Sequence, residues 1–246
     1  HEGKAGIEVP VVQVVEEHPD RFKGIVGINP TNIVPWVAKV EEAVKEYGFV
    51  GAHLYPHWFG EEPGHRMYYP FYAKCAELGI PLQIQIGHSA QHFLPTVANP
   101  MTLDRVAIDF PELKIVGIHI GYPWVEEMIS VTWKHPNVFV GCDAHSPKYW
   151  DPSFVRFINS RRGQDKVLFG TDWPVIDFKR AVDEIEERVN SLFLGVMNPE
   201  DNKNIRGFQS LTDRIEFINI SYVLDSGTKV EIYKNIFGHH IGESFL

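Results

Sequence analysis

Short apolar runs that alternate with longer segments of helical spacing constrain the fold of this chain more than any other feature. The runs begin roughly 30 residues apart, close to the spacing of βα units in an eight-unit barrel of about 250 residues. Apolar strands separated by amphipathic helices are typical of a parallel sheet. The six runs are GIVGIN ending at Asn29, FVGAHLYP ending at Pro56, PLQIQIGHS ending at Ser89, KIVGIHIG ending at Gly121, VFVGCDAH ending at His145 and VLFGTDWP ending at Pro174.

The segments between these runs have the periodicity of helices with one buried face. Apolar residues recur at spacings of three and four along residues 36–47, and Gly48 then stands where a helix ends. We expect further helices over residues 9–20, over 72–78 and over 178–192. Strands and helices therefore alternate along most of the chain.

The C-terminal part of the chain is less regular. Its polar, Asn-containing composition predicts a loop or insertion over residues 195–227, with residues 211–224 helical, and a closing helix and tail over 228–246. Nothing in the composition requires a second domain. We therefore expect residues 1–246 to form one domain.

The alternation predicts a TIM-type (β/α)8 barrel of the α/β class. Such a barrel needs eight strands, and six are visible here. The first two strands are apparently absent from the chain, and we expect them upstream, in about 60 to 80 residues at this spacing. An open doubly wound sheet is the alternative, because it requires no further strands.

Charge and composition narrow the functional classes. The 23 Lys and Arg residues against 32 Asp and Glu residues give a formal net charge of −9, which argues against nucleic acid as a partner. No run approaches the roughly 18 consecutive apolar residues of a membrane span, so we predict no membrane partner. Cys75 and Cys142 lie in apolar segments and are expected to be buried free thiols, which favours the cytoplasm.

Metal-ligand residue types gather where the predicted strands end. In a parallel barrel the active site lies at the C-terminal ends of the strands. Five of the 12 histidines fall there, and four successive runs carry His at their ends. In a barrel we expect these ends to converge on one cleft. Imidazole and carboxylate are ligands of zinc-type ions, so the pattern predicts a metal-dependent site. In chain order the strand-end residues are Asn29, His53, His57, His88, His119, Asp143, His145 and Asp172.

Three of these strand ends carry a family resemblance. The combination of QIGHS, GIHIGYPW and FGTDWP resembles the second family of the amidohydrolase superfamily, the metal-dependent hydrolases and decarboxylases related to aminocarboxymuconate semialdehyde decarboxylase. The resemblance runs from about Pro19 to about Pro174, with an echo at KVEIYKNIFG. It implies a single amidohydrolase-like barrel domain.

The resemblance also implies roles for three residues. His88 would ligate the metal, Asp172 would contact the metal and take a proton from its bound water, and His119 would be the acid or base that faces the substrate. The implied cofactor is one divalent metal, zinc by expectation and manganese as the alternative. A metal lowers the pKa of its bound water toward about 7, and a carboxylate can accept the proton on attack.

One part of the family pattern is missing. The family's first strand carries a His-x-His pair that supplies two more metal ligands, and no such pair precedes the first visible strand here. Two interpretations follow: either the chain lacks the N-terminal strands of a normal enzyme, or it is a shortened relative with weak or no metal binding.

Further residues near the strand ends are candidates for substrate binding. Their aromatic rings and imidazoles suit a small acidic or aromatic molecule. We expect Arg105 to form a surface ion pair. The candidates are His53, Tyr55, His57, Trp58 and His145.

These features predict a metal-dependent hydrolase that attacks a lactone or amide of a small substrate with metal-activated water. Non-oxidative decarboxylation at the same site is the first alternative, with His119 as the proton donor. A non-catalytic, metal-poor barrel that binds a small molecule or a partner is the second. Unpaired sheet edges would favour self-association, so a homo-oligomer is also predicted.

Overall fold

The computed structural model describes residues 9–90, 92–186 and 188–189. These residues belong to two compact units, one that contains Val9–Lys23 and one that contains Gly24–Asn190, and each is described by itself. In the first unit, helix α1 (Val9–Glu17) confirms the helix that the sequence predicts there. The predicted loop over 195–227 and the closing helix and tail over 228–246 lie outside the described residues.

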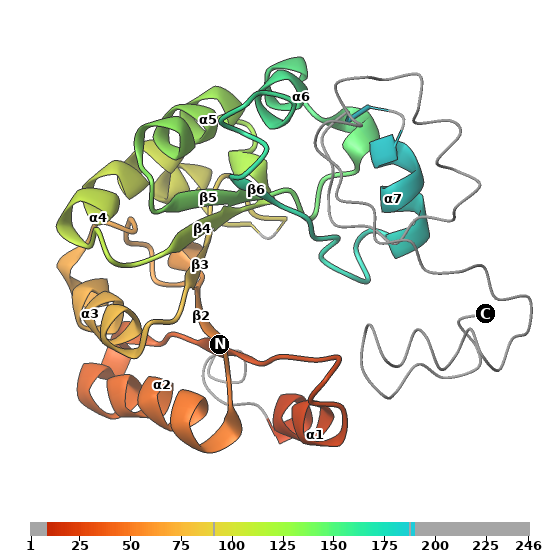
Figure 1. Cartoon of the computed structure of the whole chain (residues 1–246). Helices are drawn as coiled ribbons and strands as arrows, with labels where there is room; N and C mark the ends of the chain where they lie inside the picture. Colours follow the sequence, from red (N-terminus) through yellow and green to blue (C-terminus); the bar gives the residue numbers. More distant parts are fainter. Residues whose placement is uncertain (1–8, 91, 187, 190–246) are drawn as a thin grey trace, which may run out of the picture. The chain divides into compact units, whose positions relative to one another are not determined.

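The second unit contains one parallel sheet of six strands (Figure 1). Every neighbouring pair runs parallel, and each strand falls within one of the apolar runs of the sequence. All six predicted strands are therefore confirmed. They are β1 (Ile25–Gly27), β2 (Gly51–Leu54), β3 (Leu82–Gln85), β4 (Ile115–Ile118), β5 (Val138–Gly141) and β6 (Val167–Leu168).

The helices that connect the strands begin and end where local chemistry favours it. The helix predicted over 36–47 starts earlier, at Ile33, and ends at Gly48, whose φ of 64° lets the chain leave the helix. The helix before Gly79 likewise starts earlier, at Tyr69, with a proline in its first turn. The helices of this unit are α2 (Ile33–Tyr47), α3 (Tyr69–Leu78), α4 (Leu103–Asp109), α5 (Val125–Lys134), α6 (Pro152–Ile158) and α7 (Phe178–Glu186).

Short 3-10 helices lie in several of the loops. Five of them begin with a proline in their first turn, where the missing N–H group costs no hydrogen bond. They are η2 (Pro30–Asn32), η3 (Pro56–Trp58), η4 (Arg66–Tyr68), η5 (Pro95–Ala98), η6 (Pro100–Thr102), η7 (His119–Gly121) and η8 (Pro147–Tyr149).

The strand order is the same as the order along the chain. Helices α2 and α3 pack side by side, as do α5 and α6, and helices α2 to α6 lie along one side of the strands (Figure 1). An open doubly wound sheet reverses its strand order once and carries helices on both faces. The observed arrangement instead is that of consecutive units of a (β/α)8 barrel.

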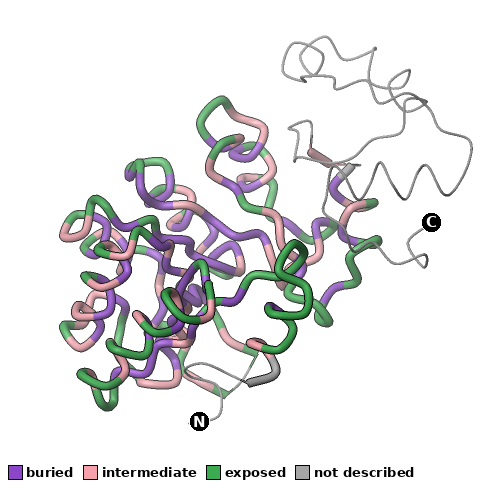
Figure 2. The backbone as a smooth tube through the Cα atoms, turned by 60° about the horizontal axis from the view of Figure 1, so that its bottom comes forward, coloured by how far each residue is buried: buried purple, intermediate pink, exposed green. Residues whose placement is uncertain are grey.

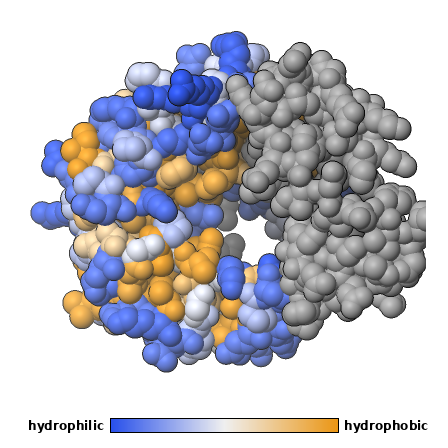
Figure 3. Space-filling model, in the orientation of Figure 1, coloured by the Kyte–Doolittle hydropathy of each residue, from blue (hydrophilic) through white to orange (hydrophobic). Residues whose placement is uncertain are grey.

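The two faces of this sheet differ in character. The face against the helices is apolar and fully buried at Ala52, Leu54, Leu82 and Ile84. Buried residues lie mainly in the interior of the described fold and exposed residues mainly along its outside (Figure 2). Residues paired in register on parallel strands share a face, and the other face carries Gly27, His53, Gln83, Val116 and Phe139 in one row. Hydrophilic side chains prevail along the outer rim of the described residues (Figure 3). Polar residues inside the strands therefore gather on the face turned away from the helices.

Among the described residues, every helix is too short or too polar to cross a bilayer.

Gly87, in the turn after β3, and Gly48 differ in the space around a side chain, so alanine at the two positions should lower the free energy of unfolding by different amounts. Gly87 has a φ of 85°, and a Cβ atom there would lie 2.2 Å from the carbonyl oxygen of Tyr122. Gly48 also has a positive φ, but a Cβ atom there would have no neighbour within 4 Å. We expect Gly87→Ala to lower the free energy of unfolding by about 3 kcal/mol or more, and Gly48→Ala by about 1 kcal/mol. Equal losses in urea unfolding would contradict this account.

Candidate active site

His119 stands directly after β4, at the start of η7, in a backbone conformation that is rare for such a residue. Its φ is 66°, and the φ of the next residue, Ile120, is 49°. A left-handed conformation costs a residue with a side chain roughly 1–2 kcal/mol. The backbone N–H of His119 donates to Asp143 Oδ1 at 3.1 Å, and this bond holds the turn. Such strained residues cluster at functional sites.

The imidazole ring of His119 has a polar partner at each end. Gln85 Nε2 lies 2.6 Å from its Nδ1 atom. On the other side, its Nε2 atom lies 3.5 Å from Asp143 Oδ2 and 3.7 Å from Asp172 Oδ2. The side chains of His119 and Asp143 are 16% and 17% exposed, whereas that of Asp172 is 45% exposed. The ring therefore lies between the buried amide of Gln85 and the carboxylates of Asp143 and Asp172, of which that of Asp172 is exposed to solvent.

Two glycines leave room for the Asp143 carboxylate. A Cβ atom at Gly141 would lie 2.8 Å from Asp143 Oδ1, and one at Gly170 would lie 3.1 Å from Asp143 Cβ. The ends of β5 and β6 can approach each other around Asp143 because both positions lack a side chain.

His88 and His145 lie in a second cluster with Tyr122. The ring of His88 meets Tyr122 edge-on at 4.9 Å and lies 5.9 Å from His145, and His145 lies 5.2 Å from Tyr122. The backbone N–H of His88 donates to the Tyr122 carbonyl at 2.7 Å. Burial, together with the neighbouring His119 and His88, lowers the pKa of His145 to about 4 against the opposing effect of the Asp143 charge. His145 is therefore a neutral imidazole at neutral pH.

The residues after β2 form a third cluster. The Tyr55 ring stacks on Trp58 at 4.5 Å and lies 5.2 Å from His57, and its hydroxyl contacts Ser89 Oγ. The His57 Nε2 atom lies 2.9 Å from the Gly87 carbonyl oxygen, while its buried Nδ1 atom has no hydrogen-bond partner. Tyr55 and Trp58 are half-buried. This cluster braces the turn that carries His88.

His53 belongs to the electrostatic surroundings of His119. Burial lowers its pKa, and the charge of His119 lowers it further, while a hydrogen bond with Gln83 and the charges of Asp143 and Asp172 raise it. The predicted candidates His53, His119 and Asp172 therefore interact within one site.

Sequence reasoning placed Asp143 at a strand end without giving it a role of its own, and it missed Gln85. Asp143 was visible only as a strand-end carboxylate, and its bond to the His119 backbone depends on a left-handed turn. Gln85 lies inside an apolar run, but it shares with His53 the face opposite the helices, and this alternation is the signal that could have found it.

Residues predicted to be structural have structural partners. Arg105 forms an exposed ion pair with Asp109 at 2.7 Å, as expected. Its neighbour Asp104 instead contacts His135 Nε2 at 2.7 Å.

A complete metal site is not formed by the described residues alone. Within residues 9–90, 92–186 and 188–189, no group of three or more His, Cys, Asp or Glu side chains is arranged to hold a metal ion. A catalytic zinc site takes three protein ligands and an open position. The His, Cys, Asp and Glu side chains of the described residues therefore do not make a complete site for the implied metal by themselves. The assignment of His88 and Asp172 as ligands stays a prediction.

Comparison with known proteins identifies the class. The family model described as Amidohydrolase, the second amidohydrolase family, matches residues 4–196, so the chain belongs to this family. The chain is 28% identical over 155 residues to a 2-keto-4-carboxy-3-hexenedioate hydratase of Sphingobium sp., a match that spans 50% of this chain and 46% of that protein. The chain therefore spans about half the length of this curated relative.

Solved structures confirm the barrel fold. An uncharacterized TIM-barrel protein from Bordetella bronchiseptica has a TM-score of 0.66 and 26% identity, over 85% of this chain and 75% of that chain. A 5-carboxyvanillate decarboxylase from Novosphingobium aromaticivorans, solved with manganese and 4-hydroxy-3-methoxy-5-nitrobenzoic acid, has a TM-score of 0.56 and 18% identity. That match covers 76% of this chain and 63% of the decarboxylase.

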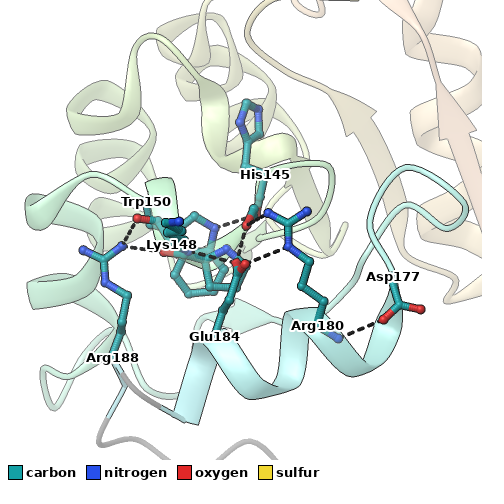
Figure 4. Close-up of polar contacts among 9 residues, drawn as sticks. His145, Lys148, Trp150, Asp177, Arg180, Glu184 and Arg188 are labelled. Carbon is teal, nitrogen blue, oxygen red and sulfur yellow. Dashed lines mark hydrogen bonds and ion pairs between the residues drawn. The ribbon is translucent and has the colours of Figure 1, made fainter.

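A polar network anchors the loop that follows His145 to helix α7 (Figure 4). Glu184 accepts hydrogen bonds from Ser146 Oγ, from Lys148 N at 3.2 Å and from Arg180 Nε at 2.7 Å. Arg188 donates to the carbonyl oxygens of residues 147 and 148, both at 2.6 Å. The Ser146 hydroxyl and the Arg180 guanidinium lower the pKa of Glu184 to about 2.

This network predicts a pH-dependent contribution to stability. Because the pKa of Glu184 falls from 4.5 to about 2 on folding, the unfolded state binds more protons in that interval, and the carboxylate stabilises the fold fully only above it. We expect Glu184→Gln to lower the free energy of unfolding by about 1 kcal/mol at pH 7, and the difference from wild type to vanish as the pH falls toward 2.

Asp183→Asn, which removes an exposed ion pair with Lys179 on the same helix, is the matched control. It should cost less than about 0.5 kcal/mol. A Glu184→Gln loss that stays constant from pH 7 to pH 3 in chemical denaturation would contradict the assignment.

Proposed function

We propose that this amidohydrolase-family chain is a lyase that transfers a proton to or from a carbon atom of a small unsaturated or aromatic carboxylic acid. The observation that carries the proposal is the placement of His119 Nε2 within 3.7 Å of two carboxylates at the C-terminal ends of the strands. An imidazole so placed is suited to general acid and base catalysis.

In this proposal His119 is the group that exchanges the proton with the substrate. In a hydration, the proton goes to one carbon of a double bond while hydroxide goes to the other. In a decarboxylation, the bond to the carboxyl carbon breaks, CO2 leaves, and a C–H bond forms in its place. Asp143 Oδ2 and Asp172 Oδ2 lie 3.5 and 3.7 Å from Nε2, so proton exchange with either carboxylate requires a closer approach or one bridging water, and Asp172 is exposed to solvent.

The substrate class rests on the surroundings of His119 and on one relative. His145 and His53 are imidazoles whose pKa values burial lowers, so they can donate hydrogen bonds without full charges, and Tyr122 adds an aromatic surface next to His145. The relative at 28% identity is named for an unsaturated keto acid. The proposed substrate binders are His53, Tyr55, His57, Trp58 and His145.

Hydrolysis of a lactone or amide, the first prediction from the sequence, is the second candidate function. It is favoured by Asp172, whose half-exposed carboxylate can take a proton from an attacking water. Product analysis separates the two: hydrolysis forms no C–H bond, whereas the proposed lyase reaction forms or breaks one.

Substitution of His119 tests the proposal. We expect His119→Gln to reduce turnover of unsaturated or aromatic carboxylic acids by at least about 100-fold, because general acid–base groups contribute 10²- to 10⁴-fold. Asp172→Asn should also reduce it. His65→Gln, at a histidine that caps η4 outside the site, should leave turnover unchanged. Full activity in His119→Gln would refute the proposal.

The family resemblance adds a metal to the proposal. Zinc or manganese would be held by His88, Asp172 and ligands beyond the described residues. Elemental mass spectrometry should find about one divalent ion per chain, and His88→Ala should reduce that content at least about 10-fold. Unchanged metal content in His88→Ala would contradict the ligand assignment.

Two further predictions stay proposals. Cys75 and Cys142 are free and buried, which favours a reducing compartment such as the cytoplasm. Strands β1 and β6 are the edges of the described sheet, so a homo-oligomer would protect them.

A further inference from the structure

We propose that Gln85 is a positioning residue that fixes the tautomer of His119, so that the ring carries its proton on Nε2. The tautomer itself is a property of the protein without substrate, and its effect on turnover rests on the function proposed above. The neutral imidazole has one donor and one acceptor nitrogen, and the hydrogen bond at one nitrogen decides which is which.

The orientation of the Gln85 amide follows from its two partners. Its Nε2 atom lies 3.4 Å from the His88 carbonyl oxygen, which can only accept, and 2.6 Å from His119 Nδ1. The –NH2 group therefore faces both atoms, and Nδ1 of His119 accepts. Because Gln85 is only 2% exposed, water does not compete for these positions.

The opposite end of the ring leads to the same tautomer. His119 Nε2 faces Asp143 Oδ2 at 3.5 Å and Asp172 Oδ2 at 3.7 Å. Ionised carboxylates accept only, so a lone pair on Nε2 would face two negative oxygens, whereas an N–H group is attracted to them. Two independent contacts, one at each nitrogen, therefore place the proton on Nε2.

This tautomer determines what His119 presents to a substrate. The Nδ1 side is closed by a buried amide, and the Nε2 side faces the carboxylate of Asp172, whose side chain is 45% exposed. The transferable proton thus lies on the side of the ring that is open to solvent. Gln85 does not need to touch a substrate to have this effect.

Nitrogen NMR of the full-length chain labelled with 15N-histidine tests the inference directly. At about pH 9, more than two units above the usual pKa of imidazole, a neutral ring shows one pyrrole-type and one pyridine-type nitrogen. The His119 signals are identified by their disappearance in His119→Gln. We expect Nε2 to be pyrrole-type and Nδ1 pyridine-type. The reverse assignment, or two protonated nitrogens, would overturn the proposal from the wild-type spectrum alone.

Gln85→Glu supplies the second test, because a carboxylate at this position can only accept. The proton should then move to Nδ1, or both nitrogens should become protonated. Gln83→Glu is the matched control: Gln83 lies on the same strand and face, but it bonds to His53. It should leave the His119 signals unchanged. A pyridine-type Nδ1 in a folded Gln85→Glu variant would overturn the proposal.

Turnover gives a separate readout. Gln85→Met should lower kcat about 100-fold with little change in KM, since it changes proton transfer and not substrate contacts. Absence of the expected tautomer from the wild-type chain refutes the role of Gln85 whatever the activity. The expected tautomer in a protein that shows no lyase activity refutes the proposed function and leaves the positioning role intact.

Discussion

The register of the six parallel strands is the constraint on which the rest of this structure depends. Parallel strands in chain order bring their C-terminal ends to one edge, and their buried face against the helices leaves the opposite face to polar residues. A slip of one residue would turn His53 and Gln85 toward the helices and apolar side chains toward the site. The packing of the helix-facing side therefore also specifies the position of the chemical groups.

A locally strained turn after β4 places the central histidine of the site. His119 and Ile120 adopt positive φ values that cost free energy, and the bond from the His119 N–H to Asp143 offsets part of that cost. The same aspartate then faces the ring at Nε2. The Asp143 carboxylate thus accepts a hydrogen bond from the backbone of His119 and also faces the Nε2 atom of its ring. A separate network on α7 anchors the loop after His145.

The sequence predicts the elements of the fold well because buried positions require apolar residues at the spacing of a strand or a helix. Each apolar run became a strand, and Gly48 and Gly79 end helices as their positions indicate. His119 and Asp172 could be predicted from the strand-end rule and the family resemblance. The left-handed turn at His119 could not be, because no local propensity favours it, and neither could the bonds of Glu184 to a loop 38 residues away.

The most direct test of the central claim, that His119 exchanges a proton with a substrate carbon, is the isotope content of the product formed in D2O. Mass spectrometry and proton NMR of the product would locate the deuterium. We predict one carbon-bound deuterium per turnover at the position that gains hydrogen, with its formation lost together with turnover in His119→Gln. A product that forms at full rate without carbon-bound deuterium would contradict the account and point to hydrolysis.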